Sequence, residues 1–176
     1  MRVMAFPGRR ALLAQLLAVL LVAVGSSLLP LSPAQAVDEG RFAGTARLPG
    51  CSASVVRWAS ALDDDPAVVL TNGHCVRFPF LGARDVLVDE KQFKQIELLD
   101  GRGQVAMTVR GVHLRYASMY RTDLAVYELR ETYADLAARG VTPFTLSATG
   151  PSRGDEIRIP SGYWGEQRDC TTTGTA

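Results

Sequence analysis

A histidine and a cysteine stand side by side at the end of an apolar segment, VVLTNGHCV, at residues 68–76. Further along, TDLAVYEL (122–129) places Asp123 directly before a second apolar segment. A carboxylate that enters an apolar strand is costly to bury unless a partner compensates its charge, and an imidazole can donate a ring N–H to it. His74 is therefore a suitable partner for the Asp123 carboxylate. A single histidine after an apolar strand is nevertheless more often a structural residue.

The cysteines are odd in number: Cys51, Cys75 and Cys170. In an oxidising compartment the nearer two make the natural pair, which leaves Cys170 without a partner in this sequence. Closing the loop from Cys51 to Cys75 would stabilise the fold by roughly 3 kcal/mol on a chain-entropy estimate. A disulfide is favoured over a nucleophilic role for Cys75, because a bridged sulfur is not a thiolate. The unpaired thiol predicts either a partner chain or a further stretch of this one.

Metal chemistry is a weaker alternative. The two histidines and three cysteines lack the short paired spacings of structural zinc ligands. We expect no metal and no other cofactor, and a metal-binding module is the third choice among the functions considered.

The first 36 residues have the pattern of a secretory signal peptide. Its features are basic residues, an apolar segment and a small-x-small cleavage site: Arg2, Arg9 and Arg10, residues 11–24, and AQA at 34–36. We expect cleavage after Ala36 and a secreted, extracellular protein, with the export route left open. The apolar segment is too short to span a bilayer comfortably and no second one follows, so no lasting membrane anchor is expected.

Without this leader the chain is nearly neutral. The sequence has 19 basic and 18 acidic residues, and the leader holds three of the basic ones and no acidic ones, which leaves 16 against 18. No basic stripe indicates a nucleic-acid partner, and the acidic run at 63–65 is typical of a solvated loop. Of 176 residues 140 remain, which suits one domain, or one domain and the beginning of another.

Short β-rich segments separated by turn residues follow the leader, with no long apolar stripe of helical period. The expected strands are residues 43–48, 52–58, 67–71, 84–88, 92–99, 105–110 and 125–129. Seven short strands at this spacing predict an antiparallel barrel or sandwich. Further along we expect a short helix, a connector, one more strand and a turn, at 132–139, 141–154, 155–160 and 162–165.

Together these residues resemble the trypsin/chymotrypsin-like serine endopeptidases of the secreted bacterial type. The resemblance rests on the early Cys51, on Thr-x-x-His-Cys at 71–75 and on Asp-Leu-Ala-Val-x-x-Leu at 123–129. The interval of 49 positions from His74 to Asp123 is similar to the family's usual one. The resemblance covers approximately residues 43 to 164.

The resemblance implies an all-β fold, an antiparallel six-stranded barrel of the trypsin-like type with a second barrel only begun. Members of this family cleave peptide bonds with a Ser-His-Asp triad. The resemblance implies that His74 is the general base of this triad and that Asp123 orients it. It also implies that Cys51–Cys75 is the family's bridge beside the histidine. His113, in GVHLRY, falls where the family often has a histidine in a loop, and we expect a structural role for it. The partners would be protein or peptide substrates, and the full-length protein would be a monomer.

The third member of the triad is missing from these residues. The family carries its serine in a Gly-x-Ser-Gly turn, whereas Ser147, Ser152 and Ser161 lie in LSATG, GPSRG and IPSGY. These sequences lack the glycines that expose the hydroxyl and shape an oxyanion hole. None of the three serines is expected to be a nucleophile.

Four parts follow from this interpretation: a signal peptide, a first barrel with the histidine and the aspartate, a linker, and the start of a truncated second barrel. Their bounds are 1–36, 37–140, 141–154 and 155–176. The expected function is a secreted serine endopeptidase, present here without its nucleophile and therefore inactive as a fragment. Cys170 would be a half-cystine whose partner lies further on. The alternative is a non-catalytic secreted binding module on a protease-like barrel.

Overall fold

The structure is a computed structural model that describes residues 40–77 and 79–174. All of these residues belong to one compact unit, Val37–Ala176. The predicted signal peptide lies outside the described residues. Within the described part of the chain, no helix is long and apolar enough to cross a membrane.

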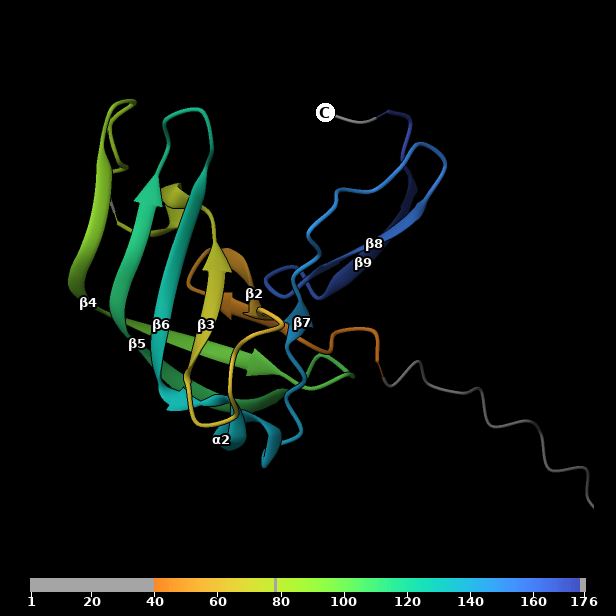
Figure 1. The fold of residues 1–176 in the computed structure, drawn as a ribbon, viewed down its shortest axis with the longest axis horizontal. Helices are drawn as coiled ribbons and strands as arrows, with labels where there is room; N and C mark the ends of the chain where they lie inside the picture. The colour runs from red at the N-terminus through yellow and green to blue at the C-terminus, as the bar shows by residue number, and fades with distance from the viewer. Residues whose placement is uncertain (1–39, 78, 175–176) are drawn as a thin grey trace, which may run out of the picture. The chain divides into compact units, whose positions relative to one another are not determined.

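Six strands form a closed ring in which each strand runs antiparallel to both of its neighbours (Figure 1). They are β1 (Thr45–Leu48), β2 (Cys51–Arg57), β3 (Pro66–Thr71), β4 (Val86–Leu99), β5 (Val105–Ser118) and β6 (Leu124–Thr132). The order around the ring is β1-β4-β5-β6-β3-β2, and the pairing of β1 with β2 closes it. The all-β class expected from the sequence is confirmed.

Apolar side chains fill the ring because they alternate with outward-facing residues along each strand. Val55, Val69, Ile96, Leu98, Leu114 and Leu129 are among the fully or almost fully buried ones. Tyr127 is the largest fully buried side chain, and its hydroxyl donates to Gln92 Oε1 at 2.9 Å. Burial raises the pKa of Tyr127 to about 12, so this phenol stays neutral in the core at physiological pH.

Strands β4 and β5 are longer than the sequence indicated. The strands expected at 84–88 and 92–99 are the single strand β4, and the strand expected to end at 110 continues through Ser118. The register of this pair shifts between Lys91 and Lys94, and Asp89 has a φ of 53°. Such an irregularity bends a strand without ending it. His113 therefore lies within β5, and the expectation of a loop there is wrong.

One short helix, α2 (Tyr133–Ala137), follows β6 inside the predicted range 132–139. Thr132 and Asp135 form a capping box at its start, which satisfies backbone N–H groups of the first turn. The buried hydroxyl of Tyr133 donates to the backbone oxygen of Val56 at 2.7 Å, so the helix is fastened to β2.

The later part of the chain contains two strands that the sequence did not indicate. Within the predicted connector, β7 (Phe144–Thr145) pairs with β2 in parallel, so the sheet is not purely antiparallel. The predicted strand at 155–160 is β8 (Glu156–Ser161), and it pairs with β9 (Glu166–Thr171) in a separate two-stranded sheet. β9 has the sequence EQRDCT, whose lack of apolar alternation hides it from a pattern search.

Replacing Tyr133 with phenylalanine tests the fastening of α2. The variant loses one buried hydrogen bond, and we expect the free energy of unfolding to fall by about 1–2 kcal/mol. Urea titration followed by circular dichroism measures this change. The control is Tyr116→Phe, because the Tyr116 hydroxyl makes no hydrogen bond within the described residues. Equal losses in the two variants would contradict the role given to the Tyr133 hydroxyl.

Candidate functional site

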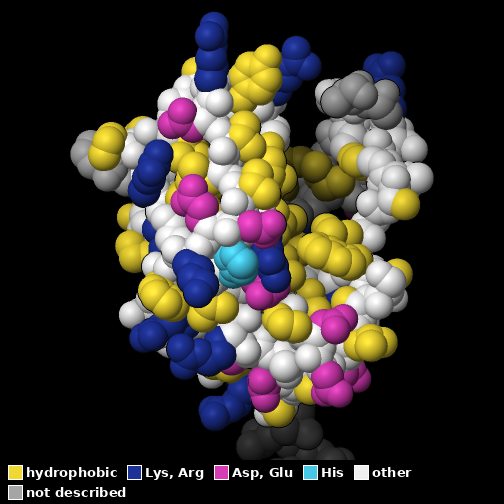
Figure 2. All heavy atoms as spheres, turned by 60° about the vertical axis from the view of Figure 1, so that its left-hand side comes forward, with side chains coloured by type: hydrophobic (Ala, Val, Ile, Leu, Met, Phe, Trp, Pro, Cys, Tyr) yellow, Lys and Arg dark blue, Asp and Glu magenta, His cyan; other side chains and the backbone are white. Residues whose placement is uncertain are grey.

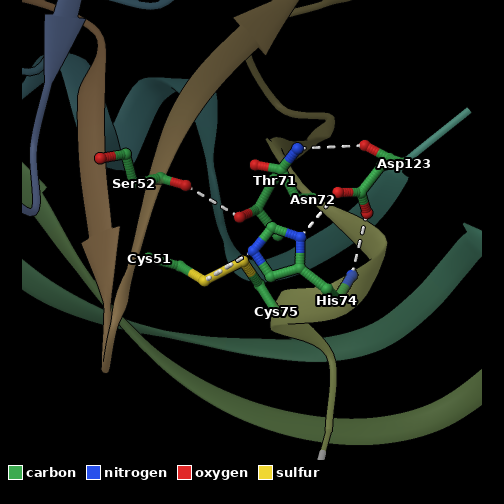
Figure 3. A network of polar contacts seen from close by, with 7 residues as sticks. All are labelled: Cys51, Ser52, Thr71, Asn72, His74, Cys75 and Asp123. Atoms are coloured by element: carbon green, nitrogen blue, oxygen red, sulfur yellow. Dashed lines mark hydrogen bonds and ion pairs between the residues drawn. A yellow bond between two sulfur atoms is a disulfide. The ribbon is translucent and has the colours of Figure 1, made fainter. Parts of the chain in front are cut away.

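His74 lies in a tight turn directly after β3. The turn is the 3-10 helix η1 (Gly73–Cys75), and the Asn-Gly sequence before the histidine is typical of a chain reversal. Backbone bonds from Cys75 N–H to Asn72 O, 3.1 Å, and from Val76 N–H to Gly73 O, 3.2 Å, close it. The turn places the imidazole at the end of the ring where β6 begins (Figure 3).

Asp123 stands immediately before β6 and meets His74 twice. The distance from His74 Nδ1 to Asp123 Oδ2 is 2.6 Å, and the backbone N–H of His74 donates to Oδ1 at 3.0 Å. The side-chain amide of Asn72 donates to the backbone oxygen of Asp123 at 3.2 Å. The structure thus brings together two predicted site residues that are 49 positions apart in the chain.

The electrostatics of this pair favour an ionised carboxylate. Desolvation raises the pKa of Asp123, but hydrogen bonds from the His74 ring and from the backbone N–H groups of His74 and Gly73 lower it by more. The resulting pKa lies below the ordinary aspartate value. An ionised carboxylate only accepts, so Nδ1 carries the shared proton and the lone pair of a neutral imidazole is on Nε2.

The pair is open to water. The side chains of His74 and Asp123 are 41% and 39% exposed. Solvent therefore screens their mutual attraction, and its contribution to stability is small. The same exposure lets a group that approaches from solution reach the imidazole.

The Nε2 edge of His74 faces the disulfide between Cys51 and Cys75 (Figure 3). Its distance to Cys51 Sγ is 3.9 Å. A bridged sulfur has no proton to donate, so this contact does not occupy the lone pair on Nε2. The predicted bridge is confirmed, and it fastens the turn that carries His74 to the first residue of β2.

The same three residues are the one grouping of potential metal ligands found among the described residues. The His74 nitrogen and the two sulfurs lie within 4.8 Å of one another. Both sulfurs are bonded in the disulfide, whereas zinc and other soft metals require thiolates. The oxidised chain therefore offers only the imidazole at this place.

Two neighbours of the site were not indicated by the sequence. The ring of Phe80 lies edge-on to the His74 ring with 6.0 Å between centroids. Lys94 Nζ donates to the backbone oxygen of Val76 at 3.0 Å, and burial lowers the pKa of this amine. Lys94 reaches Val76 from a position 18 residues further along the chain, whereas Phe80 follows His74 by only six residues. No motif around either residue indicates its contact.

The hydroxyls of two of the three serines after the aspartate have other partners. Ser147 Oγ donates to the backbone oxygen of Thr149, and Ser161 Oγ shares a hydrogen bond with Ser52 Oγ. Ser152 Oγ makes no hydrogen bond within the described part of the chain. No serine of residues 40–77 and 79–174 hydrogen-bonds to His74. Cys170 is an exposed free thiol in β9.

Comparisons of the chain with models of protein families, with curated proteins and with solved structures found no significant match. The chemistry must therefore follow from the geometry. An imidazole that is anchored through Nδ1 on an ionised carboxylate, and whose side chain is 41% exposed, can take a proton from a hydroxyl presented to Nε2.

Gly73 permits the close approach of the turn to β5, and Gly73→Ala tests this contact. A Cβ at this position would lie 2.2 Å from the backbone oxygen of Ser118 and 3.2 Å from Asp123 Oδ1. We expect the turn to shift, with a loss of about 1–3 kcal/mol in the free energy of unfolding. Gly150→Ala is the control, since nothing lies within 4 Å of its added carbon. Urea titration measures the free energy of unfolding. An unchanged value in Gly73→Ala would contradict the close contact between the turn and β5.

The lowered pKa of Asp123 predicts a pH dependence. A carboxyl whose pKa is lower in the folded state contributes stability above its unfolded pKa, near 4, and loses it as pH falls through the folded value. We expect the wild type to lose more stability than Asp123→Asn between about pH 5 and pH 2. The difference should stay below about 1 kcal/mol because the pair is exposed. Chemical denaturation at a series of pH values measures it; parallel profiles would contradict the assignment.

Proposed function

We propose that this chain carries the general base and the orienting carboxylate of a secreted, trypsin-like serine endopeptidase. The contact of 2.6 Å between His74 Nδ1 and Asp123 Oδ2 carries the proposal. It gives the imidazole one defined tautomer and leaves Nε2 for the reacting group, as proton transfer in a Ser-His-Asp triad requires. The Cys51–Cys75 bridge supports it by holding the histidine turn in place.

The proposal extends to the fold. In it the closed ring of six strands is the first barrel of the trypsin-like type, with the histidine after β3 and the aspartate before β6. The β8–β9 hairpin begins the second barrel. In the proposal, residues outside those described deliver the serine to His74, because no serine within them hydrogen-bonds to the imidazole.

In the proposed reaction, His74 Nε2 takes the serine proton as the serine oxygen bonds to the carbonyl carbon of a peptide. Asp123 stabilises the imidazolium through the Nδ1–H bond. The imidazolium then gives this proton to the departing amine, and an acyl-enzyme remains. Water attacks the acyl group by the same route: Nε2 takes its proton and returns it to the serine oxygen, so the carboxylic acid leaves and the enzyme is restored.

Secretion belongs to the same proposal. A disulfide is stable in an oxidising compartment, and Cys51–Cys75 is compatible with an extracellular protein. The leader at residues 1–36 would direct export, and protein or peptide substrates would be met outside the cell.

A non-catalytic binding module is the second candidate. The observation that favours it is the absence, within the described residues, of a hydroxyl hydrogen-bonded to His74 Nε2. In that case the His74–Asp123 contact would serve to join η1 to the start of β6.

Acylation by a fluorophosphonate probe distinguishes the two candidates. We expect the longest product of the natural reading frame to be labelled on a serine, and the 176-residue chain alone to remain unlabelled. His74→Ala in the longer product should slow labelling by about a thousandfold or more. His113→Ala is the matched control, since this histidine lies in β5 and should leave the rate unchanged.

Two outcomes would overturn the peptidase. One is a full reading-frame product with no labelled serine, and the other is a His74→Ala variant that is acylated at the wild-type rate. Either result would favour the binding module.

A further inference from the structure

Three potential metal donors meet beside the proposed base. Within the described part of the chain, Cys51, His74 and Cys75 form a grouping whose donor atoms all lie within 4.8 Å of one another. His74 Nε2 is 3.9 Å from Cys51 Sγ, and the edge of the ring that carries it faces the two sulfurs (Figure 3). The disulfide withholds both sulfurs while it is intact. Its reduction would leave one imidazole and two thiols at the same place.

The spacing of these donors suits one tetrahedral zinc ion. Zinc lies about 2.3 Å from a thiolate sulfur and about 2.0–2.1 Å from an imidazole nitrogen, so such a nitrogen and sulfur are about 3.5 Å apart. The distance of 3.9 Å from Nε2 to Cys51 Sγ is already close to this value. Two thiolates on one zinc lie about 3.8 Å apart, against about 2 Å between the sulfurs of any disulfide. The Cα atoms of Cys51 and Cys75 are 6.2 Å apart, which leaves side-chain rotation room to separate the sulfurs.

Asp123 already holds the imidazole as a metal site needs it. A metal-bound histidine usually donates its other ring N–H to a carboxylate, which fixes the tautomer and the orientation of the ring. His74 Nδ1 lies 2.6 Å from Asp123 Oδ2, and Nε2 has its lone pair on the side of the sulfurs. Imidazole and thiolate donors together favour zinc over hard ions such as magnesium and calcium.

A reductant and a metal ion can reach this place from solution. Cys51 and Cys75 are both half-buried, and the His74 side chain is 41% exposed. A small dithiol reduces the bridge by exchange: it gives up two electrons and two protons and becomes a cyclic disulfide, while both cysteines become thiols. Zn²⁺ then replaces the two thiol protons, and its charge balances the two thiolates.

We propose that the chain, once reduced, binds one zinc ion through Cys51 Sγ, Cys75 Sγ and His74 Nε2. Water completes the four ligands, since no fourth His, Cys, Asp or Glu of the described residues belongs to the grouping. Zinc on Nε2 occupies the lone pair that would take a proton, so the zinc form cannot act as a general base. The binding does not rest on the proposed peptidase, because it needs only these three donors.

Metal titration of the reduced and the oxidised chain tests the site. Both forms carry Cys170→Ser, which removes the exposed third thiol as a competing ligand. One form is reduced with a dithiol, which gel filtration under argon then removes. Cobalt(II) is the spectroscopic probe, because thiolate ligands give it a strong near-ultraviolet charge-transfer band. We expect one cobalt ion with this band in each reduced chain, displaced by zinc, and no such band in the oxidised chain.

Competition with a chromophoric chelator measures the zinc affinity. We expect the reduced chain to bind Zn²⁺ at least about a thousandfold more tightly than the oxidised chain. Figure 2 shows acidic and basic side chains scattered over the side of the molecule where β4 and β5 lie. Surface carboxylates of this kind can hold zinc weakly, and the oxidised chain controls for them because it carries the same ones.

Variants assign the ligands. His74→Ala should weaken zinc binding about a hundredfold or more, and Asp123→Asn about tenfold, because the ring loses its charged hydrogen-bond partner. His113→Ala is the matched control and should stay within about twofold of the parent chain, since this histidine lies in β5 and outside the grouping.

Circular dichroism follows the fold of the reduced chain with and without zinc. We expect zinc to raise the urea midpoint of the reduced chain, because it binds donors that folding brings together. The proposal fails if the reduced chain stays unfolded in the presence of zinc, or if it binds zinc no better than the oxidised chain. Equal losses of affinity in His74→Ala and His113→Ala would also overturn it. None of these results bears on the peptidase, which is tested by acylation of the oxidised protein.

Discussion

The antiparallel pairing of β3 with β6 is the interaction on which the candidate site depends. Thr71 at the end of β3 lies opposite Ala125 near the start of β6. This register places the turn after one strand beside the residue before the other, so His74 and Asp123 meet although they are distant in the chain. A slip of one strand by one residue would turn its inner face outward, and the buried core therefore enforces the register.

Several parts of this arrangement can be predicted from the sequence, because each depends on a short segment or on a pair of residues that can be recognised in it. The two apolar segments predicted strands. The aspartate before the second segment predicted the contact with His74, and the two nearer cysteines predicted the disulfide. The continuity of β4 was missed because the charged run 89–91 resembles a turn, whereas in the structure its outward side chains are exposed to solvent. Similarly, β9 is polar throughout and is defined only by its partner.

Other features depend on register and cannot be inferred from local pattern. Arg110 and Arg130 become neighbours only through the pairing of β5 with β6, and Arg115 is neutralised because the same pairing brings Glu128 beside it. The contact of Phe80 with His74 is local, since only six positions separate the two residues, but the loop sequence does not indicate it. The charge of a single segment therefore says little about which cations remain unbalanced on the folded surface.

The parallel pairing of β7 with β2 has a kinetic consequence. Together with the hydrogen bond between Ser161 and Ser52, it returns the chain beyond residue 140 to the strand that begins with Cys51. Cys51 is itself bonded beside His74. A group carried by this returning segment would meet the imidazole as a tethered partner, at an effective concentration on the order of millimolar for a short flexible linker. Such an encounter would depend on the length of the connecting chain and would not depend on the protein concentration.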